Sequence, residues 1–252
     1  MINLLIYFLK KDIKSKYAGS GLGLLWAFIL PLFQIFLFWF VFAGIFKARP
    51  YANTQMPYLY FLLSSFFFWL AFSDGLLRSS YAILENAEMV KKVSFPNIVL
   101  PLSVTLSSYI HHLIGFIIFI TIYTATTSFS PSHLLVIPIL FTQLVFSAGL
   151  GLIFASLMPY LRDLGQIMGY ILQGLFFLSP IMYSTDLIPK QFKLIILFNP
   201  FTYFAISYQK MILFNKPPEL HHIAIIFLLA LTAIIAGFLI FKKLREGFAD
   251  VL

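Results

Sequence analysis

Six long apolar runs follow one another along the chain, and short segments between them hold most of the charged residues. A helix rises about 1.5 Å per residue, so roughly 20 apolar residues cross the hydrocarbon core of a bilayer. The pattern therefore predicts an all-α polytopic membrane protein with six transmembrane helices. The predicted spans cover residues 22–46, 58–82, 98–123, 134–160, 166–183 and 222–241.

The composition supports this assignment. Of the 252 residues, 61% are hydrophobic and only 10% are charged, whereas soluble domains are usually about 25% charged. The apolar excess must face lipid, which excludes a soluble globular protein, a disordered chain and a nucleic-acid-binding module, despite a net charge of +8. The chain contains no cysteine, which excludes disulfides and thiolate chemistry. We expect a single transmembrane domain over residues 1–252, without a separate soluble enzyme domain.

The basic residues are distributed unevenly between the two sides. With the N-terminus inside, the inner segments hold eleven of the seventeen Lys and Arg residues and the outer segments hold six. Because Lys and Arg accumulate in cytoplasmic loops, we predict that both termini lie in the cytoplasm.

Residues 184–219 form a predicted outer segment that is unusually apolar for a loop. The Asn199-Pro200 pair breaks it into two halves. Each half is too short to cross a bilayer, which predicts short re-entrant or interfacial helices. A seventh span is the alternative, but it would place Lys242, Lys243 and Arg245 outside, against the charge rule.

Residues 1–17 are amphipathic and basic. We predict an interface helix along the inner membrane surface, where its lysines attract anionic lipid. The same helix could also contact a cytoplasmic partner.

The inner segment 84–96 mixes charged and apolar residues in a helical pattern. Pro96 restricts the residue before it and ends the pattern. A solvated loop has no need for this many apolar residues, so we predict a short helix that docks in a cleft of a cytosolic partner. The predicted contact residues are Glu85, Asn86, Glu88, Met89, Val90 and Lys91.

Motifs for catalysis are absent from the sequence. It contains no G-x-x-x-x-G-K-[ST] phosphate loop, no H-E-x-x-H and no G-x-S-x-G. We expect no catalytic residue, no metal ligand and no nucleotide hydrolysis by this chain alone. His111 and His112 fall near the middle of the third span, but adjacent helical residues point about 100° apart. No acid is apparent at a matching depth, so an interhelical hydrogen bond is favoured over a metal or proton-relay role.

Charged residues inside or beside the spans are few. Asp74 and Arg78 lie four residues apart in the second span, where they can pair. Counting from Tyr58 at about 1.5 Å per residue places Asp74 about 24 Å along the helix, near the inner interface. The pair is either a self-neutralised pair at a helix end or a polar contact beside a gate. Arg162 and Asp163 are predicted to form a charged turn on the inner side.

An amide and aromatic stripe marks the fifth span. Gln166, Tyr170, Gln173 and Phe177 follow spacings of four, three and four, which places them on one helix face. One interpretation is helix packing through glutamine hydrogen bonds. The other is a transport path, in which amides bond sugar hydroxyls and aromatic faces contact sugar rings. A weaker stripe in the first span contains Phe33, Phe36 and Phe40.

Several local motifs resemble one family. They are Lys11-Asp12-Ile13-Lys14-Ser15-Lys16-Tyr17, the Leu22-Gly23 pair with Trp26 and Pro31, the segment from Asn86 to Pro96, Tyr160-Leu161-Arg162-Asp163, Leu178-Ser179-Pro180-Ile181-Met182-Tyr183, and Asn199-Pro200. The chain resembles the membrane permease of bacterial ABC-type polysaccharide exporters of the type-2 class, the O-antigen, capsule and teichoic-acid group. Lys11 stands where arginine is common in that family.

The resemblance implies a homodimer in the bacterial cytoplasmic (inner) membrane, paired with two copies of a separate cytosolic ATPase. ATP and Mg would be bound by that ATPase, and no cofactor by this chain. A lipid-linked polysaccharide would leave through a channel between the permeases, with the 184–219 hairpin shielding the exit and the 1–17 helix beside the lipid entry. The alternatives are a type-2 exporter of a small drug or lipid, and a membrane-embedded transferase acting on lipid-linked sugars. A transferase would need acids or histidines converging at one membrane depth.

Overall fold

A computed structural model describes residues 1–17, 19, 21–47 and 56–252. Residues 18, 20 and 48–55 lie outside the described part, and Arg49, one of the predicted outer basic residues, is among them. The described residues form helices, turns and loops, with no strand among them. This confirms the all-α prediction.

The α-helices are α1 (Ile2–Tyr17), α2 (Trp26–Phe38), α3 (Tyr58–Glu85), α4 (Ala87–Lys92), α5 (Val99–Thr126), α6 (Val136–Leu157), α7 (Leu164–Phe177), α8 (Lys193–Phe198), α9 (Pro200–Leu213), α10 (Leu220–Leu244) and α11 (Phe248–Val251). A π-helical segment, η2 (Trp39–Ile45), extends α2. Short 3₁₀ turns are η1 (Gly23–Leu25), η3 (Pro131–Leu135), η4 (Thr185–Leu187), η5 (Lys190–Phe192) and η6 (Arg245–Gly247).

Five helical segments of the described chain are long and apolar enough to cross a membrane: Trp26–Ile45, Tyr58–Glu85, Val99–Thr126, Pro131–Leu157 and Leu220–Val251. They correspond to five of the six predicted spans. The 14-residue helix α7, Leu164–Phe177, covers only the first part of the predicted fifth span, 166–183. That helix is about 21 Å long at about 1.5 Å per residue, shorter than a hydrocarbon core of about 30 Å. The polytopic fold is confirmed, and the sixth span stays a prediction.

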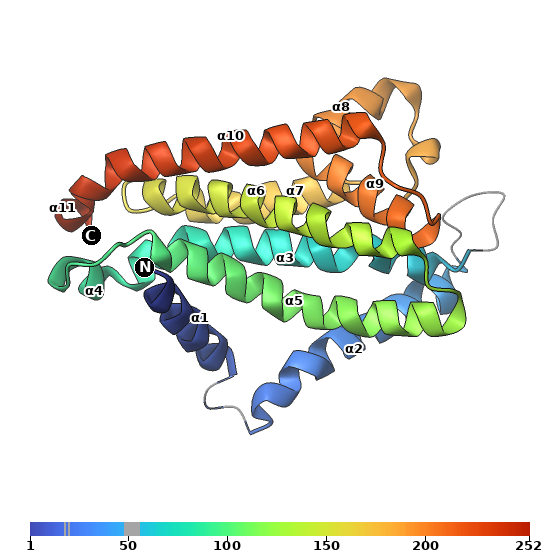
Figure 1. The fold of residues 1–252 in the computed structure, drawn as a ribbon, viewed down its shortest axis with the longest axis horizontal. Helices are drawn as coiled ribbons and strands as arrows, with labels where there is room; N and C mark the ends of the chain where they lie inside the picture. The colour runs from blue at the N-terminus through green and yellow to red at the C-terminus, as the bar shows by residue number, and fades with distance from the viewer. Residues whose placement is uncertain (18, 20, 48–55) are drawn as a thin grey trace.

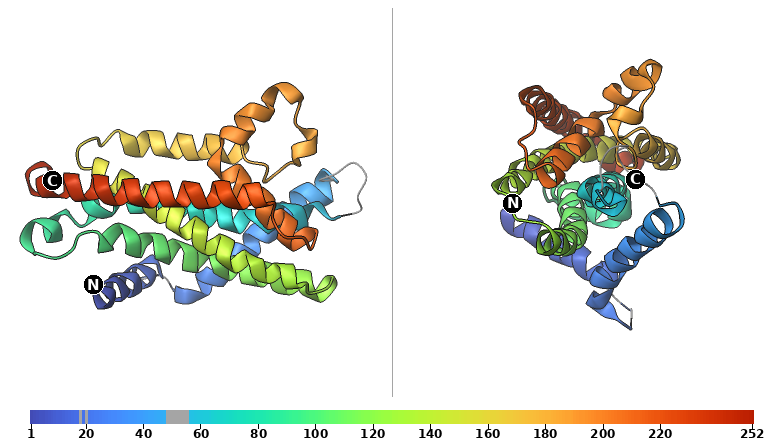
Figure 2. Two further views of the ribbon diagram at one scale, coloured as in Figure 1. Left: turned by 45° about the horizontal axis from the view of Figure 1, so that its top comes forward. Right: turned by 90° about the vertical axis from the view of Figure 1, so that its right-hand side faces the viewer.

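The long helices run side by side, and the chain ends meet at one end of the bundle (Figure 1). Both termini, α4 and α11 lie at that end, whereas α8 and α9 lie toward the other. Figure 2 shows α7 on the outside of the bundle and α2 leaning away from it. Of the described side chains of α2, only Ala27 and Pro31 are buried. Two outer helices therefore flank the central helix α3.

The end of α7 is fixed by the loop that follows it. Pro180 disfavours a helical conformation at Ser179, which is consistent with α7 ending at Phe177. The amide of Asn199 donates to the Leu175 carbonyl at 2.9 Å and to the Ser179 hydroxyl at 2.8 Å. The Asn199 side-chain oxygen accepts a bond from the Phe201 N–H at 3.0 Å, which caps the N-terminus of α9. One asparagine thus ends one helix and starts another.

The two helices of the 184–219 segment differ in burial. In α8, Leu194 and Phe198 are exposed, whereas Phe201, Phe204 and Tyr208 of α9 are fully buried. Helix α9 packs among α3, α6 and α10. The Tyr208 ring stacks on Phe68 with centroids 3.7 Å apart, and its hydroxyl donates to the Gln143 side chain at 2.7 Å. The break at Asn199-Pro200 is confirmed, and the re-entrant geometry stays a prediction.

A separate apolar cluster, here called the basal cluster, occupies the end of the bundle that holds the termini. Its buried members are Phe8, Ala82, Ile83, Val99, Leu100, Val104, Leu152, Ala155, Phe241 and Phe248. They come from α1, α3, α5, α6, α10 and α11. Half-buried Met89, Val90 and Phe95 pack against it. The cluster therefore joins the short helix α4 to both chain ends.

Helices α6 and α10 cross closely through two glycines. A Cβ added at Gly149 would collide with the backbone of Ala233 and Ile234, and one at Gly237 with the Gly149 carbonyl. Small residues permit this approach, which favours van der Waals packing between helices in lipid.

We expect Gly149→Ala to destabilise the folded protein by about 1–3 kcal/mol, because its methyl group meets fixed backbone. The measurement is the thermal unfolding midpoint of the detergent-purified protein. Gly174→Ala is the matched control, since no atom lies within 4 Å of its added Cβ. Equal midpoints for the two variants would contradict the close crossing.

Candidate functional site

A group of ion pairs joins α1 to the bundle. The Arg78 guanidinium donates two bonds to the Asp12 carboxylate, at 2.7 and 2.9 Å, and a third to the Ser108 hydroxyl at 3.1 Å. Both charged side chains are less than one third exposed. Such charge-assisted bonds are stronger than neutral ones, so Arg78 fixes α1 against α3 and α5.

Asp74 also belongs to this group of ion pairs and contacts residues of three helices. Its Oδ2 lies 3.2 Å from the Lys16 ammonium of α1, 3.6 Å from Nε2 of His112 and 3.9 Å from Arg78. The expected Asp74–Arg78 pair is therefore present but loose, because Arg78 is closer to Asp12. Burial lowers the pKa of Lys16, and the attraction of Asp74 opposes this effect.

The prediction that no acid lies at the depth of His112 is wrong. Helices α3 and α5 pack side by side, which brings Asp74 within 3.6 Å of His112. A count along one helix cannot give this pairing. One feature of the sequence could have indicated pairing between α1 and α3: Asp12 and Lys16 have the same four-residue spacing as Asp74 and Arg78. In the structure these two acid–base pairs exchange partners between α1 and α3, Arg78 with Asp12 and Lys16 with Asp74.

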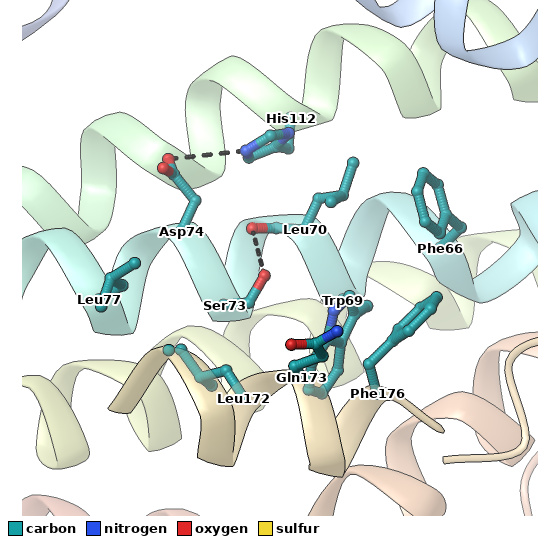
Figure 3. Close-up of a pocket in the computed structure, with 11 residues that line it drawn as sticks. Phe66, Trp69, Leu70, Ser73, Asp74, Leu77, His112, Leu172, Gln173 and Phe176 are labelled. Carbon is teal, nitrogen blue, oxygen red and sulfur yellow. Dashed lines mark hydrogen bonds and ion pairs between the residues drawn. The ribbon is translucent and has the colours of Figure 1, made fainter. Parts of the chain in front are cut away.

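A groove of about 470 Å³ lies between α3 and α7 (Figure 3). We call it the α3–α7 groove. Asp74 and Ser73 of α3, His112 of α5 and Gln173 of α7 supply its polar groups. The remaining lining is Phe66, Trp69, Leu70, Leu77, Gly169, Leu172 and Phe176.

A second groove, of about 420 Å³, lies between α2, α3 and α5. Phe33 and Gln34 of α2 line it together with His111. Leu70 and His112 line both grooves. One residue of each predicted stripe therefore lines a groove, Gln173 of α7 in the first and Phe33 of α2 in the second, and His112 lines both.

Most of both stripes points away from the chain's own core. In α7, Gln166 and Gln173 are exposed, Tyr170 is 77% exposed and Phe177 is 58% exposed. In α2, Phe33, Phe36 and Phe40 are each about half exposed. Packing against another helix of the described chain therefore does not account for these side chains.

The segment 84–96 contains the short helix α4, as the pattern predicts. Glu85, Glu88 and Lys91 are exposed, whereas Asn86, Met89 and Val90 are half-buried. The Asn86 amide donates to the Ala82 carbonyl at 2.9 Å. Met89 and Val90 pack partly on the basal cluster of their own chain, so the charged residues and Val93, 54% exposed, form the outer face.

The turn after α6 lies beside the chain end. Arg162 and Asp163 are exposed in this turn, and its position on the inner side stays a prediction. The Tyr160 hydroxyl donates to the Leu244 carbonyl at 2.8 Å, and Gly247 leaves room for it. Phe248 is buried beside Tyr160 and Phe241. The turn, α4 and α11 thus belong to one packed end.

One group of possible metal ligands was not singled out from the sequence. Ligand atoms of Glu219, His221 and His222 lie within 4.8 Å of one another at the start of α10. Lys210 already forms an ion pair with Glu219 and lowers the pKa of that exposed carboxyl. The partial positive charge of a helix N-terminus also opposes a cation. The arrangement therefore does not favour a metal site.

We expect a double-mutant cycle of Asp12→Asn and Arg78→Gln to give a coupling energy of about 0.5–3 kcal/mol, because the residues are in direct contact. The measurement is thermal unfolding, with proteolysis of α1 as a second readout. Arg78→Gln alone should expose α1 to protease. Additive effects of the two substitutions would show that the ion pair does not hold α1.

Comparison with known proteins identifies the family. Residues 3–213 match the family described as ABC-2 type transporter. An O-antigen export system permease protein RfbA of Klebsiella pneumoniae is 30% identical over 257 aligned positions, covering 100% of this chain and 96% of the relative. The RfbA permease of Myxococcus xanthus is 25% identical, covering 98% and 94%. The polysialic acid transport protein KpsM of Escherichia coli is 25% identical, covering 75% and 73%.

The match covers most of the chain and includes α1, α4 and the groove helices α3, α5 and α7. The family that the sequence motifs indicated is therefore confirmed, and this chain belongs to the ABC-2 type transporter family.

Proposed function

We propose that this chain is the permease subunit of an ATP-driven exporter that moves a lipid-linked, O-antigen-like polysaccharide across the bacterial inner membrane. Relatives that align over nearly their full length are named O-antigen export permeases. The observation that carries the proposal is the uncovered amide and aromatic face of α7. Exposed amides are costly against hydrocarbon, so a polar or hydrated neighbour suits them better than lipid.

A second copy of the chain supplies the other wall of the path. Helices α2 and α7 flank the grooves beside α3, and their stripes are exposed. In a homodimer with these faces opposed, two sets of aromatic rings and amides would surround the polymer. Weak and repeated contacts suit a chain that must slide, because conduction requires that no site bind too tightly.

Energy comes from two copies of a cytosolic ATPase, which bind ATP and Mg. This sequence has no phosphate loop, and α4 presents charged residues at the bundle end. The basic bias favours a cytoplasmic position for that end and both termini. In this arrangement α7 with the following turn forms the sixth crossing, and the 184–219 segment shields the exit.

The contacts of Asp74 argue against a membrane-embedded transferase. Asp74 and His112 do converge, which such an enzyme requires. However, Asp74 is also contacted by Lys16 and Arg78. These contacts pair the carboxylate with cations of the same chain, as in a structural ion-pair group.

We expect Tyr170→Ala to lower surface polysaccharide several-fold while the membrane level of the protein changes little, since the ring is 77% exposed. The measurement is surface glycan per unit of permease in cells. Phe238→Ala is the matched control, because that exposed ring lies on α10, away from the grooves. Wild-type export by Tyr170→Ala would reject the proposed path.

We expect Val93→Asp to weaken binding of the ATPase about tenfold, equivalent to about 1.4 kcal/mol, because it places a charge on an exposed apolar contact. Val93 is a cleaner probe than Met89 or Val90, which also pack within the chain. The measurement is co-purification and ATPase stimulation in membranes. Leu194→Asp makes a similar change on exposed α8, at the other end, and should leave ATPase binding intact. Equal binding by both variants would contradict docking at α4.

A further inference from the structure

The α3–α7 groove combines two kinds of surface. Aromatic rings of Phe66, Trp69 and Phe176 form part of its wall. The polar groups Asp74, His112 and Gln173 come from three different helices. In Figure 3, Asp74 and His112 lie on the side of α3 that faces α5, and Gln173 lies on α7 at the opposite side of α3. A mostly apolar concavity with a few convergent polar groups is typical of a ligand site.

The polar groups narrow the class of ligand. An acyl chain or an apolar drug in the groove would desolvate the exposed Gln173 amide without giving it a hydrogen bond, which is costly. A sugar ring offers hydroxyls to an amide, a carboxylate and an imidazole, all of which can bond them. Its C–H faces can also lie against aromatic rings.

The balance of charges around the groove restricts the class of ligand further. Asp74 is contacted by Lys16 and Arg78, so its negative charge is compensated within the protein. Arg78 is in turn paired with Asp12. The groove therefore presents hydrogen-bonding groups without a large excess of either charge. This suits a neutral hydroxyl-rich ring better than an acidic sugar or a phosphate.

We propose that the α3–α7 groove is a binding subsite for one neutral sugar ring of the transported glycan, with Asp74, His112 and Gln173 bonding its hydroxyls and Phe176 contacting its face. This assignment rests on the proposed export function. The proposed subsite lies beside the path along α7. Gln173 is the one residue that the subsite shares with the exposed stripe of α7.

The test uses engineered cysteines, because the natural chain has none. Gly169 lines the groove, and no atom lies within 4 Å of its added Cβ. The export rate of unmodified Gly169→Cys is the reference with which each reagent is compared. Complete modification with a bulky maleimide should then lower surface glycan at least fivefold, whereas methyl methanethiolsulfonate should have a smaller effect. Leu228→Cys, exposed on α10, is the control for the reagent.

Gly174→Cys separates failure of this subsite from failure of the proposed function. Gly174 is also exposed on α7, with open space at its Cβ, but it does not line the groove. If the maleimide blocks export at 174 and not at 169, the subsite is wrong and the path along α7 stands. If it blocks export at neither position, both the subsite and the path are wrong.

Substitution of Gln173 separates a sugar site from a lipid site. We expect Gln173→Leu, which removes the amide at similar volume, to lower export at least threefold, and Gln173→Asn to retain more than half. Protein level and co-purification of the ATPase should be unchanged in both. Export at the wild-type rate by Gln173→Leu would overturn the sugar assignment, because an apolar occupant would not need the amide.

Discussion

The crossed ion pairs between α1 and α3 are the constraint on which the rest of the site depends. Asp12 binds Arg78, and Lys16 binds Asp74, so two cations and two anions neutralise one another within a mostly apolar bundle. Removing one partner would leave a partly buried charge unpaired, which is more costly than losing the pair. The arrangement holds Asp74 at the edge of the α3–α7 groove and beside His112.

Helix α7 is held at both ends and buries one face, with Met168 and Leu172 in the core, while its opposite face stays uncovered. Near the start of α7, Gly165 lets α7 approach Tyr81 of α3 closely. At the other end, Asn199 bonds the Leu175 carbonyl and begins α9, whose aromatic residues fill the bundle. The core space beside α3 is thus taken by α9, and α7 stays outside with its polar face free for another molecule.

The sequence predicted those parts of the fold that depend on hydropathy and on local motifs. Five spans, the helix after Glu85, and the break at Asn199-Pro200 are present within a few residues of their predicted positions. It did not predict the short α7, because apolar residues continue beyond Phe177 while Pro180 breaks the helix. Nor did it predict the Asp74–His112 contact, because pairing across helices depends on packing. Met89 and Val90 were predicted as partner contacts from their apolar character, which equally suits packing in the basal cluster.

A continuous set of contacts connects α4 to the groove. Phe95, just beyond α4, stacks on Phe8 of α1 with ring centroids 5.9 Å apart. Helix α1 then runs without interruption to Lys16, which contacts Asp74. A helix transmits displacement along its axis, because its backbone hydrogen bonds resist local deformation. A displacement of α4 would therefore reach Asp74 through Phe95 and α1, so α1 links the end of the bundle that holds α4 to a residue that lines the groove.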